Sequence, residues 1–452
     1  MRPKTAPPVP VEEFYALRPK AVWQHVKTEH FSFWMICAYL FVEYVRPQSI
    51  MPSLDILPWA KLFLILSLIG RLADRSAKWV SDSANIWITV FLLVVVLSCS
   101  IAVYPAYAWS HFMDFASWYV IYFLIINIIY TEKRLLIFIA LFLLCSFKLS
   151  WFGAKTWTLR GFAFTTWGLQ GPPGFFQNSG ELAIQMLMFS PVAYELAIFT
   201  KQYTSKLKHY VFLLFPLTGA MTVMGASSRG GQIAMAYQAY RSLLKGRLSF
   251  KVLIGVALFS FAAWNLLPAE QKARFSTAGD DTTSKQRLLY WQHGREIIES
   301  HPALGIGFFN FPPYFAAHWP QDLIRGPAFT DKGLPVSELP HNIFVQVGTD
   351  AGCIGLAVFG LLLWRNASAA RDVIKECKKH PERNKPYGHI AKGLLIALWG
   401  FIIAGQFVTV TYYPFFWVNL ALTVALRNIT RKEFASEPSS VHAHSSAIAA
   451  QS

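Results

Sequence analysis

Long apolar runs, nearly free of charged side chains, recur along this chain and limit what it can fold into. Each run has roughly 15 to 22 residues, about the length that a helix needs to cross ~30 Å of hydrocarbon. The runs are continuous rather than alternating, and they are too long for the ~10-residue strands of a membrane barrel. Because 54% of the residues are hydrophobic and only 15% are charged, a water-soluble fold would leave too much apolar surface uncovered. We therefore predict an all-α protein, a polytopic bundle of transmembrane helices.

The pattern predicts about twelve such helices, and one of them is short enough to be re-entrant, at 231–244. The spans are expected at residues 32–48, 57–71, 86–103, 112–130, 134–151, 179–199, 209–225, 231–244, 250–267, 341–364, 390–408 and 412–427. The chain then divides into a basic leader (1–30), a first helical part (31–267), a large polar loop with short helices (268–340), a second helical part (341–430) and a tail predicted to be disordered (431–452).

The distribution of charge sets the expected orientation. The net charge is +16, and Arg and Lys gather at the N-terminus and in alternate loops, such as Lys201–Lys208 and Arg365–Lys392. By the positive-inside rule these segments face the cytoplasm, and both termini lie there. The connections Tyr104–His111 and Thr409–Pro414 carry no Lys or Arg, and we expect them on the opposite, outer side with the large loop. Membrane orientation accounts for the basic charge, so nucleic acid is not a predicted partner.

Cysteine usage gives no sign of a metal centre. The five cysteines stand at positions 37, 99, 145, 353 and 377, without a CxxC pair and outside the large loop. Two tail histidines, His442 and His444, are more typical of a solvated segment than of a metal site. We therefore predict no disulfide framework and no metal site built on a cysteine pair.

The polar stretch from Pro268 to Pro340 is where we expect chemistry, because a protein that only spans or conducts has little use for such an insert. Its helix signal, Ser284–Ser300, places Arg287 beside Tyr290 and Trp291 at helical spacing. Such a helix presents a guanidinium on an aromatic wall. The alternative is an ordinary surface helix whose charges pair with one another.

Two further sites are expected on the same side of the membrane. Ser228, Arg229 and Gly230 stand between two apolar runs, and a helix start with an adjacent Arg is a ready anion site. The alternative is a tight turn whose Arg reaches the lipid headgroups. His341 follows Pro340 at the expected start of a helix, where the positive helix end favours the neutral imidazole that a general base needs. The alternative is a hydrogen-bonding cap.

These residues carry a family resemblance. The segment Ser228–Gly231, the Arg287 helix followed by Gly305-Ile306-Gly307, and His341-Asn342-x-Phe344 resemble, in this order, motifs of the O-antigen ligase and polymerase superfamily. The resemblance extends over about residues 30 to 430. The segment Gly174–Ala183 is further similar to the branch of exosortase-associated O-glycosylation ligases, and Glu181 in it is a candidate substrate-binding carboxylate or a helix N-terminal carboxylate.

The resemblance implies a glycosyltransferase of the bacterial inner membrane. Such an enzyme moves a glycan from an undecaprenyl pyrophosphate carrier to an acceptor hydroxyl on the periplasmic face, without a cofactor. Arg229 and Arg287 would hold the pyrophosphate, and His341 would activate the acceptor for inverting attack. The implied substrate-binding residues are Ser228, Gly230, Tyr290, Trp291, Asn342 and Glu181.

Several readings stay open. Within the same superfamily, the chain could be an O-antigen or exopolysaccharide polymerase or a protein O-oligosaccharyltransferase. A transporter or flippase for lipid-linked sugars would also need a basic site and about twelve helices, but it should show repeated halves, and none is evident in the sequence. A structural component of an envelope assembly is a third class, and it needs no polar cluster in the loop.

Overall fold

The computed structural model describes residues 10–74, 78–165, 168–244, 265 and 282–435. The described chain is mainly helical. Its helices are α1 (Glu12–Tyr15), α2 (Pro19–Val26), α3 (Phe31–Val45), α4 (Pro47–Ile50), α5 (Trp59–Ala73), α6 (Ser83–Ser100), α7 (Pro105–Ile128), α8 (Glu132–Leu159), α9 (Ser179–Thr200), α10 (Lys206–Gly225), α11 (Arg229–Leu243), α14 (Thr282–Ser300), α15 (Phe311–His318), α16 (Ile343–Lys379), α17 (Tyr387–Ala404) and α18 (Pro414–Ala435). Three short 3-10 helices, η1 (Pro52–Leu54), η2 (Pro320–Asp322) and η3 (Pro381–Arg383), and the antiparallel strands β1 (Ala328–Phe329) and β2 (Pro335–Val336) complete it.

Seven helices in the described part are long and apolar enough to cross a membrane, namely α6, α7, α8, α9, α10, α16 and α17. This confirms the predicted class, an all-α polytopic membrane protein. Helices α3, α5 and α11 also coincide with predicted spans, but each has 15 residues and is only about 22 Å long at 1.5 Å per residue. The predicted span 250–267 lies outside the described residues apart from position 265.

Short polar side chains fix where several helices begin. Asn178 caps α9, and its backbone N–H donates to Glu181 at 3.0 Å, so the two residues form a capping box. Ser205 caps α10 and Ser228 caps α11 without a capping box. Each hydroxyl accepts a hydrogen bond from a backbone N–H of the first turn. These polar residues therefore set helix starts that the apolar pattern alone leaves open by several residues.

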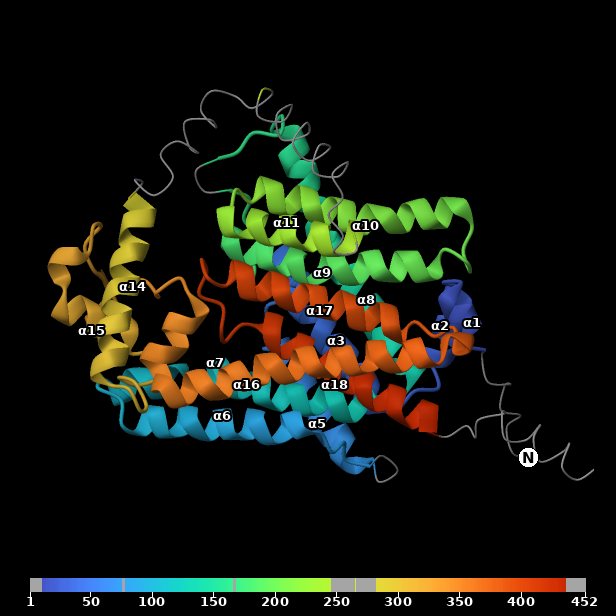
Figure 1. Cartoon of the computed structure of the whole chain (residues 1–452), viewed down its shortest axis with the longest axis horizontal. Coiled ribbons are helices and arrows are strands. Elements are labelled where there is room, and N and C mark those ends of the chain that lie inside the picture. Colours follow the sequence, from blue (N-terminus) through green and yellow to red (C-terminus); the bar gives the residue numbers. More distant parts are fainter. Residues whose placement is uncertain (1–9, 75–77, 166–167, 245–264, 266–281, 436–452) are drawn as a thin grey trace, which may run out of the picture.

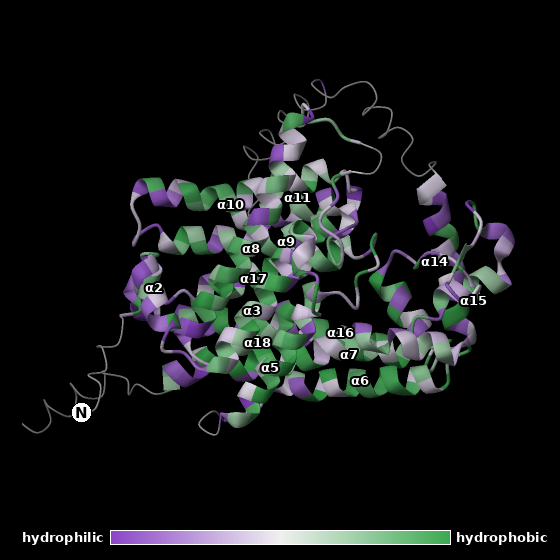
Figure 2. Ribbon diagram, turned by 180° about the vertical axis from the view of Figure 1, so that it is seen from behind, coloured by the Kyte–Doolittle hydropathy of each residue, from purple (hydrophilic) through white to green (hydrophobic). Residues whose placement is uncertain are grey.

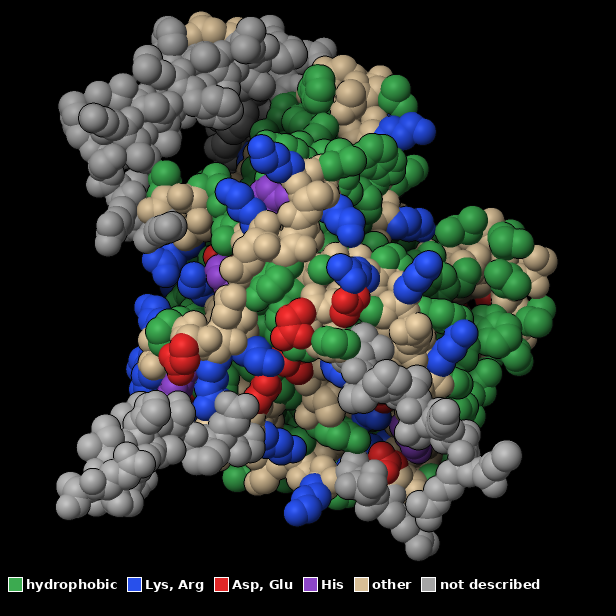
Figure 3. Space-filling view, turned by 90° about the vertical axis from the view of Figure 1, so that its right-hand side faces the viewer, with side chains coloured by type: hydrophobic (Ala, Val, Ile, Leu, Met, Phe, Trp, Pro, Cys, Tyr) green, Lys and Arg blue, Asp and Glu red, His purple; other side chains and the backbone are tan. Residues whose placement is uncertain are grey.

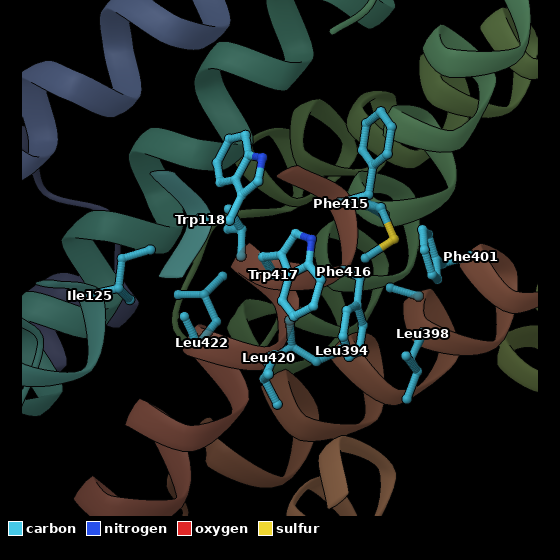
Figure 4. Close-up of a cluster of buried hydrophobic side chains, with 14 of the residues drawn as sticks. Trp118, Ile125, Leu394, Leu398, Phe401, Phe415, Phe416, Trp417, Leu420 and Leu422 are labelled. Carbon is cyan, nitrogen blue, oxygen red and sulfur yellow. The ribbon is translucent and has the colours of Figure 1, made fainter. Parts of the chain in front are cut away.

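Helix α9 runs through the middle of the bundle, with α10 on one side and α17 on the other (Figure 1). The contact with α17 is close because a Cβ at Gly393 would lie only 2.7 Å from the Cα of Val192. Small residues of this kind are typical of packed membrane helices. Beneath α17, buried aromatic side chains from α7 and α18, including Trp118, Phe416 and Trp417, fill the core (Figure 4).

The hydropathy of the ribbon follows the expected membrane arrangement. Apolar residues dominate the middle of the long helices, and polar residues collect toward the ends (Figure 2). Many large apolar side chains point outward, among them Ile65 and Leu72 on α5, Leu93 on α6 and Leu217 on α10. Such an apolar exterior is stable in lipid but not in water.

The two ends of the bundle differ. Helices α14 and α15 lie at one end, and α1 and α2 lie at the other (Figure 1). The end with α1 and α2 shows many Lys and Arg side chains and fewer carboxylates (Figure 3). It includes the connection between α9 and α10, with Lys201 and Lys206, and the connection between α16 and α17, with Lys385. At the other end, the described part of the large loop (282–340) carries basic and acidic residues in equal number, so the two ends differ in charge.

The large loop has a small apolar core of its own. Tyr290 and Ile297 of α14 pack with Phe311 and Phe315 of α15 and with Leu323. The rings of Tyr290 and Phe315 meet edge to face, with centroids 4.8 Å apart. The described part of the loop is therefore a packed unit, and the predicted helix Ser284–Ser300 is confirmed as α14.

The loop unit is tied to the bundle at two connections. The backbone N–H of Tyr104 donates to Asn310 Oδ1 at 2.6 Å, and that of Val103 donates to the carbonyl of Ile306 at 3.0 Å. In the connection between α17 and α18, Thr409 accepts a hydrogen bond from the backbone N–H of His341, which lies just before α16. The two short connections without Lys or Arg therefore lie at the same end as the large loop, as predicted.

Candidate active site

The three predicted motifs line one cavity. It has a volume of about 610 Å³ and lies where α11 and α14 begin and where the loop enters α16. It is also lined by residues at the start of α9 and in the connection after α17. The lining residues are Asn178, Ser179, Gly180, Ser227, Ser228, Arg229, Gly230, Thr282, Thr283, Ser284, Arg287, Leu288, Trp291, Arg325, His341, Phe407 and Val408.

Arg229 reaches this cavity because a tight turn ends α10 and starts α11. Ser227 takes a left-handed conformation, with φ 56°, and the Ser228 hydroxyl accepts a hydrogen bond from the N–H of Gly231 at 3.3 Å. Arg229 is then the first residue of α11, and its side chain is exposed. The guanidinium and the positive end of the helix therefore lie at the same wall of the cavity.

Gly230 has a different use from the one expected. It was predicted to bind substrate, but a Cβ there would lie 2.5 Å from the ring of Phe407. Gly230 is therefore needed where α11 packs on the connection after α17, although it also lines the cavity.

Arg287 is carried by α14, whose position is fixed by packing against α16. A Cβ at Gly294 would lie 2.4 Å from Val345 Cγ1, and one at Gly348 would lie 2.4 Å from Ile298 Cδ1. These two glycines let the helices approach closely. Trp291 also lines the cavity, and its indole N–H donates to the carbonyl of Pro340 at 2.9 Å. Trp291 therefore links the Arg287 helix to the residue directly before His341.

A buried histidine holds the outer side of α14. His293 Nδ1 lies 2.8 Å from Glu296 Oε2, and His293 Nε2 lies 2.8 Å from Asp322 Oδ2. The ring also stacks on Trp319, with centroids 4.2 Å apart. This node joins α14 to η2 and so supports the helix that carries Arg287.

The node predicts an acid-sensitive loop. The hydrogen bond from His293 lowers the pKa of Glu296 from its ordinary value of 4.5. Its contribution to stability is therefore complete above about pH 4.5 and is lost as the pH falls through the lowered pKa. We expect hydrogen exchange of α14, corrected for the intrinsic rate, to quicken below that pH and to do so less in Glu296→Gln. Glu299→Gln is the matched control, because Glu299 pairs with Arg295 on an exposed face. Equal acid sensitivity in Glu296→Gln would contradict the prediction.

His341 lies just outside the helix, not within its first turn. Its backbone is left-handed, with φ 52°, and its N–H donates to Thr409 Oγ1 at 2.6 Å. Asn342 is the N-cap, and its Oδ1 accepts from the N–H groups of Phe344 and Val345 at 2.8 and 3.2 Å. A non-glycine residue in this conformation is held by its surroundings, and such positions are frequent at functional sites.

Glu338 is a site residue that the sequence reasoning missed. Its Oε2 lies 3.1 Å from His341 Nε2, and this hydrogen bond lowers the pKa of Glu338, which therefore stays ionised at neutral pH. The expectation for His341 rested on the helix end alone and did not include this carboxylate. A sequence signal existed, because Glu338 stands three residues before His341.

Three predicted substrate-binding residues have clear structural partners. Glu181 completes the capping box of α9. It is therefore the helix N-terminal carboxylate that was the alternative to a substrate-binding residue. Asn342 caps α16, and its Nδ2 donates to Gln406 Oε1 at 3.3 Å. Tyr290 belongs to the loop core and is 2% exposed, although it lines a second, smaller cavity. Ser228, Gly230 and Trp291 line the larger cavity itself. Whether any of these residues contacts substrate stays a prediction.

No group of three or more His, Cys, Asp or Glu side chains in the described ranges is placed to hold a metal ion. The absence of a metal requirement stays a prediction. The described part of the cavity offers instead the guanidiniums of Arg229, Arg287 and Arg325, one imidazole and several hydroxyl groups. Guanidiniums bind phosphate oxygens through paired hydrogen bonds, so the arrangement suits a phosphorylated ligand.

Fold and cavity together define a polytopic helical membrane protein with an arginine-rich site at one end. Residues 212–360 of the chain match the model of the O-antigen ligase family. The match covers about a third of the chain and includes Arg229, Arg287 and His341. It confirms the predicted resemblance of this part of the chain to the O-antigen ligase superfamily. No curated protein matches the chain, and the exosortase-associated branch stays a prediction.

Proposed function

We propose that this protein is a membrane glycosyltransferase that moves a glycan from an undecaprenyl pyrophosphate carrier to an acceptor hydroxyl. The observation that carries the proposal is the shared cavity: Arg229, Arg287 and His341 come from three separate segments and line one space. All three also lie within the region that matches the O-antigen ligase family. The resemblance to this superfamily favours a glycosyl transfer of this general type over transport.

The two arginines would hold the pyrophosphate of the donor. Arg229 adds its guanidinium to the positive end of α11, and Arg287 approaches from α14. When the anomeric C–O bond breaks, the bridging oxygen leaves with the pyrophosphate and gains negative charge. Donors placed before the reaction stabilise that charge without reorganisation, and such stabilisation is commonly the largest single contribution to the rate.

His341 would act on the acceptor. The acceptor oxygen attacks the anomeric carbon from the side opposite the pyrophosphate, its proton passes to His341, and undecaprenyl pyrophosphate leaves. One C–O bond forms and one breaks, so the configuration at the anomeric carbon is inverted. Glu338, 3.1 Å from the ring, would orient the imidazole and stabilise the imidazolium that forms.

The same charge asymmetry supports an orientation in the bacterial inner membrane. The end with α1 and α2 carries the basic connections, and the site lies at the other end (Figures 1 and 3). With the basic end in the cytoplasm, the site faces the periplasm and both termini lie in the cytoplasm. Nucleotide sugars are cytoplasmic, so a lipid-linked donor suits this placement.

Transfer by the purified protein tests the proposal. A synthetic polyprenyl-pyrophosphate glycan is supplied as donor with a panel of acceptors: lipid A core, free oligosaccharides and Ser/Thr peptides. We expect a product whose new linkage has the inverted anomeric configuration, detected by mass spectrometry and NMR, and formed equally well with a metal chelator. Loss of activity with the chelator would contradict the metal-independent mechanism. Movement of the carrier across vesicles without product would favour a transporter.

A further inference from the structure

A separate cavity lies at the opposite end of the bundle from the active site. It has a volume of about 630 Å³ and lies where α9 ends and α17 begins, with the last turns of α16 alongside. It has no lining residue in common with the cavity that holds Arg229, Arg287 and His341. A ligand of this cavity would therefore be a third molecule, distinct from the donor and the acceptor of the proposed transfer.

The lining of this cavity is basic. Lysines come from the end of α9, from α16, from the connection before α17 and from α17 itself, namely Lys201, Lys378, Lys385 and Lys392. No Asp or Glu of the described chain lines the cavity. Lys and Arg side chains are also prominent over this end of the bundle (Figure 3). Because like charges held close together repel one another, the arrangement suits an anion.

Two of these lysines keep their charge available. Lys201 and Lys378 are exposed, and neither makes an ion pair with another described residue. Lys385 differs, because it is held between Glu132 and Glu433 at 2.8 and 2.9 Å. An anion can therefore be bound by Lys201 and Lys378 without breaking an existing ion pair.

A buried carboxylate positions two more basic groups. Glu195 of α9 is 5% exposed, and its Oε2 lies 2.7 Å from His389 Nδ1 and 3.9 Å from Lys392 Nζ. A carboxylate within a membrane-spanning helix is costly unless it is paired. Here one carboxylate serves two basic groups, and the longer distance leaves N–H donors of Lys392 for a ligand. The site is therefore built into the helices and is not confined to the loops.

Hydrogen bonds join the two connections that border the cavity. Gln202 Nε2 donates to Asn384 Oδ1 at 3.1 Å, and Asn384 Nδ2 donates to the Tyr203 hydroxyl at 2.8 Å. The chain after α9 is thus held against the chain before α17. The backbone that carries Lys201 is therefore fixed relative to α17, which carries Lys392.

Apolar side chains beside the lysines favour a lipid over a free phosphate. Ile198, Ile374 and Phe434 line the same cavity. Ile198 is 41% exposed and stands three residues before Lys201, on the same face of the membrane helix α9. A lipid would place its phosphate at the ammonium groups and its acyl chains against these side chains, whereas a free phosphate would leave them in water. Basic cavities between membrane helices bind the headgroups of anionic lipids.

We propose that this cavity binds the phosphate group of an anionic phospholipid, held by Lys201, Lys378 and Lys392 with its acyl chains beside Ile198. The site goes beyond the proposed glycosyl transfer and does not depend on it. A lipid bound there would connect α9, α16 and α17 at this end of the bundle.

Binding of defined lipids to the purified full-length protein tests this proposal. The protein in neutral detergent is titrated with phosphatidylglycerol and, separately, with zwitterionic phosphatidylethanolamine, and bound lipid is counted by native mass spectrometry. The cavity variant combines Lys201→Gln, Lys378→Gln and Lys392→Gln. The matched control removes the same charge from three exposed lysines at the same end that do not line the cavity, by Lys206→Gln, Lys375→Gln and Lys432→Gln.

We expect the wild type to bind phosphatidylglycerol roughly tenfold or more tightly than phosphatidylethanolamine, since each lysine close to an anionic headgroup strengthens binding several-fold. The cavity variant should lose this preference and the control variant should keep it. A wild type without the preference would overturn the proposal, and so would an equal loss in both variants.

Inorganic phosphate identifies the source of the bound group. Compared with chloride at equal ionic strength, millimolar inorganic phosphate should displace little phosphatidylglycerol from the wild type. Displacement that follows the phosphate concentration would show that the site serves a free anion and would overturn the assignment to a lipid.

Lysine labelling locates the site without any substitution, and so does not depend on how the variants fold. Acetylation of the wild type by an N-hydroxysuccinimide ester is followed by peptide mass spectrometry. Added phosphatidylglycerol should slow the reaction of Lys201 and Lys378 several-fold and leave that of Lys206 and Lys375 nearly unchanged. Equal slowing at all four lysines would contradict the placement of the lipid.

Discussion

His341→Ala should abolish glycan transfer while leaving the fold intact. Removing a general base costs typically ~10²–10⁴ in rate, and here the alanine would also leave Glu338 without the ring that it contacts at 3.1 Å. The imidazole makes no other hydrogen bond with the described residues, and the backbone hydrogen bond to Thr409 is kept. The protein should therefore elute and melt as the wild type does. The measurement is product formation with the lipid-linked donor.

His318→Ala is the matched control for this variant. His318 lies at the end of α15, is exposed, and contacts the carbonyl of Tyr314 at 2.8 Å rather than the cavity. It should keep full activity. Transfer by His341→Ala within a few-fold of the wild type would show that another group takes the proton and would remove His341 from the mechanism.

The role of Glu338 can be separated from that of His341. Glu338→Gln should lower the rate less than His341→Ala, because the base remains. An unchanged rate in Glu338→Gln would indicate that the carboxylate only supports the local structure.

Arg229→Ala and Arg287→Ala should each reduce transfer roughly a hundredfold, about 3 kcal/mol of transition-state stabilisation. Each guanidinium would oppose the charge that develops on the departing pyrophosphate. Lysine at either position should restore only part of the rate, because a point charge cannot make the paired hydrogen bonds of a guanidinium. The measurement is kcat/KM with saturating acceptor, together with the affinity for undecaprenyl pyrophosphate.

Arg295→Ala is the control for both, since Arg295 lies on the exposed face of α14 and pairs with Glu299 at 3.5 Å. The variant should lower kcat/KM of transfer less than twofold, because exposed ion pairs contribute only about 0–1 kcal/mol. Wild-type activity in Arg229→Ala would refute its assigned role, and the donor would then have to be held by Arg287 and Arg325 alone.

Much of the helical architecture was predictable from the sequence. The predicted spans 134–151, 179–199 and 209–225 correspond to α8, α9 and α10, and the loop helix to α14. Hydrophobic runs and helical spacing are local properties, so they can be read without knowing any contact. The resemblance also named Arg229, Arg287 and His341, which the structure brings to one cavity.

Other features could not be predicted in this way. Tyr290 and Trp291 are neighbours in the sequence, yet Tyr290 is buried in the loop core, whereas Trp291 is only partly buried against that core and also lines the larger cavity. Gly230 was predicted to bind substrate, but a Cβ at this position would meet the ring of Phe407. Glu338 was overlooked because its significance depends on where the His341 ring points.

By itself, the sequence determined that this protein is a polytopic helical membrane protein with one large polar loop, because apolar length and charge distribution act residue by residue along the chain. Only the tertiary structure decided that three distant segments share one cavity and that Glu338 contacts the ring of His341. These depend on how closely helices approach, as at Gly294 against Val345. Such packing is a property of pairs of surfaces and is not contained in either segment alone.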